Sequence, residues 1–336
     1  MSNYIIRSGL RRAFGDSVNR WLQCSRQAIL SYRTKKIASS ILAIAMVFTI
    51  GGCTNQAPNP SNEPIQQQTD VHNNEQAIMD NYNTLLQKGD VSIPEIINFI
   101  DVNLSAVSQL NGSTMIIGLE KVQYDRLPKM QDKFSDEAVQ KIVAKGYQNG
   151  VDYVNSIQNK QVKDLLLETK NSGYKIETAE GMFFPVIDYS FYKKYHANMT
   201  GDIAAFFDIM AVESDKTPIK DAALIISWAE ILKRAQAQEQ FIKDYSNSAK
   251  VEDMRQQLRR YATFAMYGGN NTPLFSYETK QIVPEAKKVY LETKFDETNG
   301  SFSKAMLGYL EVLKKNNYRL TNEVQEYRNK VVEEIR

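Results

Sequence analysis

The residues of this chain best suited to chemistry lie in one irregular segment, residues 173–196. Glycines and a proline interrupt the segment, and aromatic side chains crowd it. Two acids stand in this otherwise apolar run, followed by tyrosines and a histidine. The candidate ligand-binding residues are therefore Glu180, Asp188, Tyr189, Tyr192 and His196. Aromatic faces combined with a few acids suit a sugar, an amine or a peptide. Irregular segments held on a rigid scaffold often carry such binding.

Other interpretations of this segment remain open. Glu180 and Asp188 could form an acid/base pair that cleaves a glycoside, but spacing in the sequence does not give the separation in space that this mechanism requires. The segment could also be a buried connector whose acids cap the flanking helices. A Ser–His–Asp triad would have to use His196, and no Gly-x-Ser-x-Gly motif accompanies that histidine.

The chain has few cysteines and histidines that could act as metal ligands. The cysteines are Cys24 and Cys53, and the histidines are His72 and His196. Zinc sites use three or four Cys, His or carboxylate ligands, so a single histidine in the folded part argues against such a site. We expect neither a metal ion nor another cofactor.

A second irregular stretch, residues 267–277, holds two glycines and Pro273 between helical patterns. Gly268 can adopt the positive φ that is common at a helix end, and the following asparagines favour a turn. No Lys-Ser or Lys-Thr pair follows the glycines at the spacing of a phosphate loop. We interpret this stretch as a loop.

Helical periodicity runs through the rest of the chain, from about residue 77 to residue 336. Ser92-Ile93-Pro94-Glu95 has the residues of a capping box with a proline in the first turn. Thr217-Pro218 predicts the start of the longest helix, which would run to about Tyr245. The predicted fold is all-α, with about nine to eleven helices in one domain and a short extended segment near residues 173–188.

An export signal precedes this domain. Basic residues at Arg33, Lys35 and Lys36 are followed by an apolar run of about 14 residues, from Ile37 to Ile50. That order is typical of a secretory signal. The run is shorter than the roughly 20 residues that span a bilayer as a helix, which argues against a permanent transmembrane anchor.

The tetrapeptide Ile50-Gly51-Gly52-Cys53 ends the apolar run and resembles the lipobox of bacterial lipoproteins. The resemblance implies that the chain is cut before Cys53 and lipidated on the sulfur of that residue. Residues 1–52 would then be the signal peptide. Its true start would lie near Val18 or Leu30, because the segment before the basic residues is long for an ordinary signal. Two acyl chains give a stable anchor, whereas one gives only marginal binding.

Residues 53–76 are the predicted lipidated N-terminus and flexible tether. They include three prolines and hardly any large apolar residue, so they cannot bury enough surface to offset the entropy of ordering. Eight of the 41 basic residues and one of the 39 acidic residues precede residue 54, which leaves the mature chain with a net charge near −5. That balance argues against nucleic acid as a partner.

These features predict a protein held by lipid on the extracytoplasmic face of the cell membrane. The pattern also resembles uncharacterised lipoproteins of Gram-positive-type bacteria, which implies a location and no activity. The first hypothesis is a non-enzymatic module that binds a ligand or an envelope protein. The alternatives are an envelope enzyme acting on glycan or peptide through Glu180 and Asp188, and an atypical solute-binding component of an uptake system.

Overall fold

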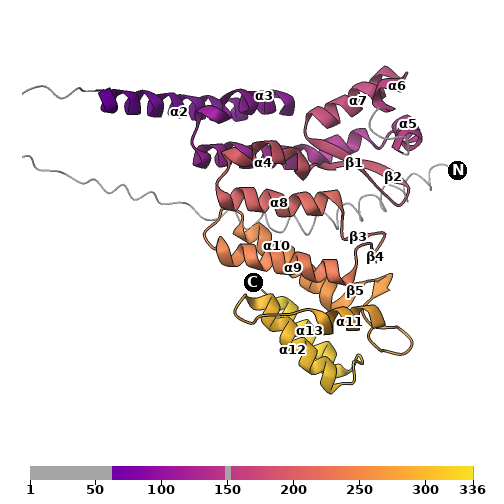
Figure 1. The fold of residues 1–336 in the computed structure, drawn as a ribbon. Coiled ribbons are helices and arrows are strands. Elements are labelled where there is room, and N and C mark those ends of the chain that lie inside the picture. Colours follow the sequence, from indigo (N-terminus) through magenta and orange to yellow (C-terminus); the bar gives the residue numbers. More distant parts are fainter. Residues whose placement is uncertain (1–62, 148–152, 336) are drawn as a thin grey trace, which may run out of the picture. The chain divides into compact units, whose positions relative to one another are not determined.

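The computed structural model describes residues 63–147 and 153–335. Among them, eleven α-helices have nine residues or more and one further α-helix has four, which confirms the predicted all-α fold (Figure 1). The helices are α2 (Glu63–Gln87), α3 (Ile93–Asn103), η2 (Leu104–Ala106), α4 (Gln109–Lys133), α5 (Glu137–Tyr147), α6 (Tyr153–Ser156), α7 (Lys160–Asn171), η3 (Tyr189–Asn198), α8 (Gly201–Asp215), α9 (Trp228–Asp244), α10 (Val251–Tyr267), α11 (Pro284–Glu292), α12 (Ser301–Lys315) and α13 (Asn322–Glu334).

The first described helix begins earlier than predicted. The predicted signal peptide and the lipobox with Cys53 lie outside the described residues, but α2 starts at Glu63 rather than near residue 77. The predicted tether is thus corrected over residues 63–76, which are helical. Pro64 suits a first helical turn, where its missing N–H would have no partner. Within the described residues, no helix is long and apolar enough to cross a bilayer.

The middle of α2 is fixed to the start of α4. The carboxylate of Glu75 accepts a hydrogen bond from the backbone N–H of Ser108 at 2.7 Å and another from the side-chain amide of Asn111 at 2.7 Å. About two helical turns further along α2, the hydroxyl of Tyr82 donates to the carbonyl of Met115 in α4 at 2.7 Å. Contacts advance together along both helices, so α2 and α4 run in the same direction.

The capping box at the start of α3 is confirmed. The hydroxyl oxygen of Ser92 accepts from the backbone N–H of Glu95 at 3.3 Å, and the carboxylate of Glu95 accepts from the backbone N–H of Ser92 at 2.7 Å. This reciprocal pair satisfies two N–H groups that the first turn of a helix leaves without partners. The local sequence therefore fixes where α3 begins.

The predicted helix from Thr217 is wrong over its first eleven residues, 217–227. The chain there forms β3 (Ile219–Lys220) and β4 (Ala223–Leu224), and α9 begins only at Trp228. Asp221 and Ala222 turn the chain between the strands with φ of 49° and 60°. Positive φ lies outside the right-handed helical region, so no α-helix can pass through these two residues.

Two more hairpins interrupt the helices. The longer one pairs β1 (Tyr174–Ala179) with β2 (Met182–Ile187) and confirms the predicted extended segment. The third hairpin pairs β5 (Gly268–Gly269) with β6 (Thr272–Pro273) in the stretch predicted to be a loop. All three are antiparallel and each forms its own two-stranded sheet. Figure 1 shows β1 to β5 on the same side of the helices, one hairpin after another.

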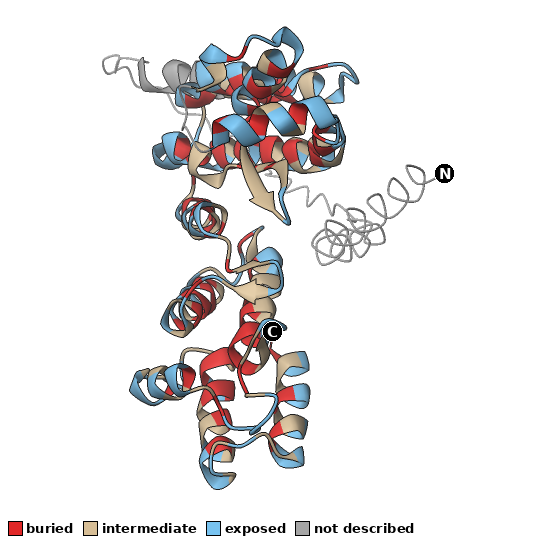
Figure 2. Cartoon of the chain, turned by 90° about the vertical axis from the view of Figure 1, so that its right-hand side faces the viewer, coloured by how far each residue is buried: buried red, intermediate tan, exposed pale blue. Residues whose placement is uncertain are grey.

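Three clusters of buried hydrophobic side chains hold the helices together. The first, around Ile100 and Tyr192, joins α2, α3, α4, η3 and α8. The second, around Tyr261 and Tyr309, joins α9 to α13. The third, around Phe134, lies between α5, α7 and the β1–β2 hairpin. Figure 2 shows buried residues mainly where helices face one another, as expected for amphipathic helices.

Charged groups also lie inside the packed helices. The Lys250 ammonium is 2.5 Å from the Glu120 carboxylate, which also accepts from the Tyr189 hydroxyl at 2.9 Å. Burial alone would lower the pKa of Lys250, but Glu120 and Asp253 outweigh burial and raise it, so the ammonium stays charged. These contacts connect α4, η3 and the start of α10.

Candidate functional site

Glu180 lies at the tip of the β1–β2 hairpin. Its φ is 50° and that of the next residue, Gly181, is 75°, which is the backbone of a tight two-residue hairpin turn. Both residues are exposed. The backbone N–H of Glu180 donates to the Asp221 carboxylate at 3.0 Å. This position gives Glu180 a role in the turn and exposes its side chain to solvent.

Asp188 caps the helix that follows the hairpin. Its carboxylate accepts from the backbone N–H of Ser190 at 3.1 Å and lies 3.7 Å from the ammonium of Lys175. Glu180 and Asp188 flank opposite ends of β2, and six strand residues at roughly 3.3 Å each place them about 20 Å apart. An acid/base pair that cleaves glycosides is separated by about 5 to 10 Å. The fold therefore does not bring the two carboxylates together, and it matches the capping interpretation for Asp188.

Tyr189 and Tyr192 belong to the first hydrophobic cluster. Their ring centroids are 6.0 Å apart, and Tyr192 stacks on Phe207 at 4.3 Å. The Tyr192 hydroxyl donates to the side-chain oxygen of the buried Gln123. Burial raises the pKa of both tyrosines well above the ordinary value, and Glu120 adds to the rise. These neutral, hydrogen-bonded phenols stabilise the core, where Tyr192 is fully buried and Tyr189 is partly buried against it.

His196 is the last of the five candidates and lies near the end of η3. Its Nε2 is 3.2 Å from the Asp208 carboxylate, and both side chains are more than half exposed. Among the side chains of the five candidates, Tyr189 and Tyr192 form a ring contact. The structure divides the members of the predicted ligand-binding set among a turn, a helix cap, the first hydrophobic cluster and an exposed part of η3, so the set stays a prediction.

The three hairpins are joined at their tips by hydrogen bonds, and we call residues 174–187, 219–224 and 268–273 the hairpin row. Asp221 is central to the row. Its carboxylate holds the first hairpin through Glu180, and its backbone carbonyl accepts from the side-chain amide of Asn271 at 2.7 Å. The N–H of Asn271 donates to the Ala222 carbonyl at 3.0 Å. The tips of separate hairpins therefore share one hydrogen-bonded arrangement.

Two further contacts stiffen the hairpin row. Lys220 in the second hairpin pairs with Glu177 in the first at 2.8 Å. The Thr272 hydroxyl in the third accepts from the N–H of Leu224 in the second at 2.7 Å. A Cβ on Gly269 would lie 2.7 Å from the Ala222 carbonyl oxygen, so this close approach of two backbones needs glycine. Each hairpin is short, but the row is fixed by contacts between hairpins.

The hairpin row presents a mixed polar and apolar surface. All six tip residues are exposed, and they are Glu180, Gly181, Asp221, Ala222, Asn270 and Asn271. Ile225, directly after β4, is 43% exposed, and Tyr277, whose hydroxyl donates to the Asn270 carbonyl at 3.0 Å, is 67% exposed. Exposed aromatic and aliphatic side chains beside fixed polar groups are typical anchors of protein interfaces.

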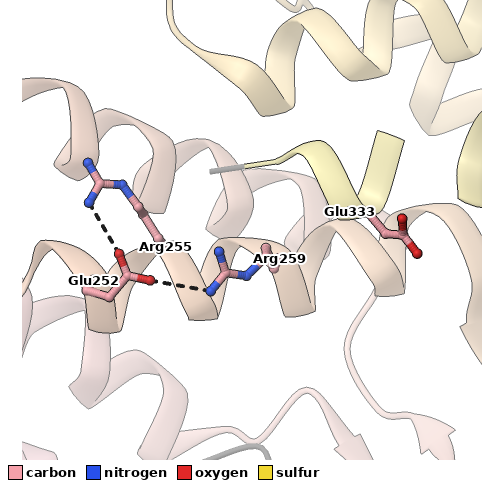
Figure 3. Close-up of a pocket in the computed structure, with 4 residues that line it drawn as sticks. All are labelled: Glu252, Arg255, Arg259 and Glu333. Atoms are coloured by element: carbon pink, nitrogen blue, oxygen red, sulfur yellow. Dashed lines mark hydrogen bonds and ion pairs between the residues drawn. The ribbon is translucent and has the colours of Figure 1, made fainter. Parts of the chain in front are cut away.

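A shallow pocket lies between α10 and α13 and has a volume of about 410 Å³ (Figure 3). Glu252, Arg255 and Arg259 line it from α10, and Glu333 lines it from α13. In Figure 3 the Glu252 carboxylate lies between the two guanidinium groups. The sequence interpretation missed these residues. The spacing of the two arginines, four residues apart in a helix, is the signal that could have identified one wall.

Neither a search for metal-binding groups nor comparison with known proteins narrows the chemistry of the candidate site further. In the described part of the chain, no three His, Cys, Asp or Glu side chains are grouped so that they could hold a metal ion. No protein-family model, curated protein or solved structure matches the chain. The hairpin row and the α10–α13 pocket remain as candidate binding surfaces.

Proposed function

We propose that this chain is a lipid-anchored module of the bacterial cell envelope that binds another envelope protein through the hairpin row. The observation that carries the binding proposal is the set of hydrogen bonds between hairpin tips. A surface fixed before binding loses little conformational entropy when a partner docks. Ile225 and Tyr277 supply apolar anchors beside the fixed tips.

The position of the hairpin row within the described unit supports this proposal. The anchored segment enters through α2, which contacts the start of α4 through Glu75 and Asn111. The first hairpin contacts the other end of α4, where the Gln131 amide donates to the Pro185 carbonyl at 3.1 Å. The twenty residues from Asn111 to Gln131 span about 30 Å of helix at about 1.5 Å per residue. The hairpin row and the entry of the anchored segment therefore lie at opposite ends of α4.

The anchor itself is supported by the sequence order of basic residues, apolar run and lipobox. It is tested by the variant Cys53→Ser, with Cys24→Ser as the matched control. In cells fed a clickable fatty acid, we expect wild type and Cys24→Ser to carry the label and to sediment with membranes. Cys53→Ser should lose the label, because its sulfur is gone, and should remain uncleaved.

The same labelling experiment separates two kinds of anchor. Membrane association of an unlabelled wild-type chain would contradict lipidation and favour a transmembrane anchor in residues 37–50.

The second half of the proposal, partner binding, predicts that a photoreactive group on the hairpin row captures a protein in intact cells. A group on an exposed helix outside the row should not capture that protein.

A further inference from the structure

Asparagine directly followed by glycine is a pair of residues that can modify itself without an enzyme. The backbone nitrogen of the glycine can attack the side-chain carbonyl carbon of the asparagine, because glycine has no side chain to block the approach. Within the described residues, this pair occurs at Asn111-Gly112 in α4 and at Asn299-Gly300 before α12. The two pairs have the same chemistry but different surroundings, so the fold decides which of them reacts.

The pair in α4 is protected by the helix. The Gly112 N–H donates to the Ser108 carbonyl at 2.8 Å, and the Asn111 side-chain amide donates to the Glu75 carboxylate at 2.7 Å. Gly112 is also buried, and a Cβ at its position would lie 2.3 Å from the Asn198 carbonyl oxygen. Attack requires the Gly112 nitrogen to leave its hydrogen bond and α4 to open around it, which costs free energy.

The pair before α12 has neither restraint. Asn299 and Gly300 end the connection between α11 and α12, and the Gly300 backbone is extended, with φ of 162° and ψ of −164°. Within the described part of the chain, no hydrogen bond holds the Gly300 N–H. The Asn299 N–H donates to the Asp296 carbonyl at 3.0 Å. The turn before the pair is therefore ordered, while the attacking nitrogen is free.

A lysine is placed to assist the reaction at Asn299. The Lys243 ammonium, on α9, donates to the Asn299 side-chain oxygen at 3.2 Å. Attack on the side-chain carbon moves electrons onto that oxygen, and a cation within hydrogen-bond distance stabilises the negative charge as it develops. The side chain of Asn111 instead contacts the anion of Glu75, which gives no such stabilisation.

We propose that Asn299 is a self-modification site that converts to aspartate and isoaspartate. The Gly300 nitrogen forms a bond to the Asn299 side-chain carbon, the bond from that carbon to the amide nitrogen breaks, and ammonia leaves with the proton of the Gly300 N–H. Water then opens the resulting succinimide ring on either side. The products are aspartate, and isoaspartate, whose main chain is longer by one carbon. This reaction depends on neither the lipid anchor nor the hairpin row.

The modification acts directly on the start of α12. Either product adds a negative charge beside Lys243, and isoaspartate also lengthens the main chain directly before Gly300. There is little room for this change, because a Cβ on Gly300 would lie 2.6 Å from a carboxylate oxygen of Glu239. The same carboxylate caps α12, since it accepts from the backbone N–H of Phe302 at 2.7 Å and of Ser303 at 3.0 Å.

The test is peptide mass spectrometry of the purified full chain, sampled over weeks at neutral pH and physiological temperature. Trypsin releases residues 295–304 as one peptide, in which Asn299 is the only asparagine. Replacement of the side-chain NH₂ by OH raises the mass of this peptide, and chromatography separates isoaspartate from aspartate. We expect conversion at Asn299 to be at least about tenfold faster than at Asn111, since reaction at Asn111 must wait for α4 to open. A sample taken at time zero gives the background from digestion.

Urea and two lysine variants assign the difference to the fold. In the chain unfolded by urea, both asparagines should convert at similar rates, because α4 no longer protects Asn111. Lys243→Gln should slow conversion at Asn299 by about twofold to fivefold, whereas Lys233→Gln, which changes an exposed residue on the same helix, should not. Equal rates at the two asparagines in the folded chain, or no conversion at Asn299, would overturn the proposal. A Lys243→Gln variant that reacts as fast as wild type would overturn the assistance assigned to Lys243.

Discussion

Replacing Arg234 with alanine should lower the free energy of unfolding by about 3 kcal/mol or more, because it breaks a buried ion pair. The Arg234 guanidinium lies 3.4 Å from the Glu213 carboxylate, and both side chains are only 6% exposed. It also donates to the Lys216 carbonyl at 2.8 Å and to the Tyr261 hydroxyl at 3.2 Å. Alanine would leave the Lys216 carbonyl without this donor in the interior, where water cannot replace it. Glu213 would keep the Arg260 guanidinium at 3.2 Å and the Tyr261 hydroxyl at 2.6 Å but would lose the more deeply buried of its two cations.

The contact between Arg234 and Glu230 provides the control for this prediction. Glu230 is 31% exposed and lies 2.8 Å from the same guanidinium, four residues earlier on α9. Glu230→Ala should cost about 1 kcal/mol or less, because a half-exposed pair of this kind contributes little. Urea unfolding monitored by circular dichroism measures both variants. Equal losses for Arg234→Ala and Glu230→Ala would contradict the assignment of the large effect to burial of charge.

Gly173→Ala should also destabilise strongly, by about 2 to 4 kcal/mol. Gly173 joins α7 to β1 with a φ of 71°, which L-residues with a side chain rarely adopt. An added Cβ would lie 2.4 Å from the Nε2 of Gln123. Gln123 cannot move freely, since its side chain is fully buried and donates to the Ser172 carbonyl at 2.7 Å. The substitution therefore adds a steric clash to a backbone penalty.

Gly181→Ala separates the two contributions. Gly181 has a similar φ of 75°, but no atom lies within 4 Å of the Cβ that alanine would add. Only the backbone penalty remains there, about 1 kcal/mol. Thermal unfolding should therefore rank wild type above Gly181→Ala and Gly181→Ala above Gly173→Ala. A Gly173→Ala variant as stable as Gly181→Ala would show that Gln123 yields without cost.

The fold class could be predicted because helix signals are local. The capping box at Ser92 and the periodic apolar stripes depend on residues three or four positions apart, and the structure contains both. The hairpin at Asp221 and Ala222 could not be predicted from such local signals. Its turn lacks the glycine that usually marks positive φ, and Thr217-Pro218 imitates a helix start.

The candidate binding surfaces depend on contacts distant in sequence. The hydrogen bond from Glu180 to Asp221 spans 41 positions, and that from Asn271 to Asp221 spans 50. Periodicity carries no information about such pairs. The same holds for the pocket, where Arg255 and Arg259 form a visible helical pair but Glu333 comes from another helix. Glu180 and Asp188, close in sequence, are instead kept apart by the extended strand between them.

The measurement that tests the central proposal most directly is site-specific photo-cross-linking in intact cells. A photoreactive amino acid replaces Tyr277, which contacts Asn270 at the edge of the hairpin row, in one variant and Leu291 on α11 in the control. These two side chains are 67% and 57% exposed. We predict a discrete adduct with one envelope protein from position 277, and no such adduct from position 291. Absence of an adduct at position 277, or the same adduct at both positions, would contradict the proposal that the hairpin row binds a partner.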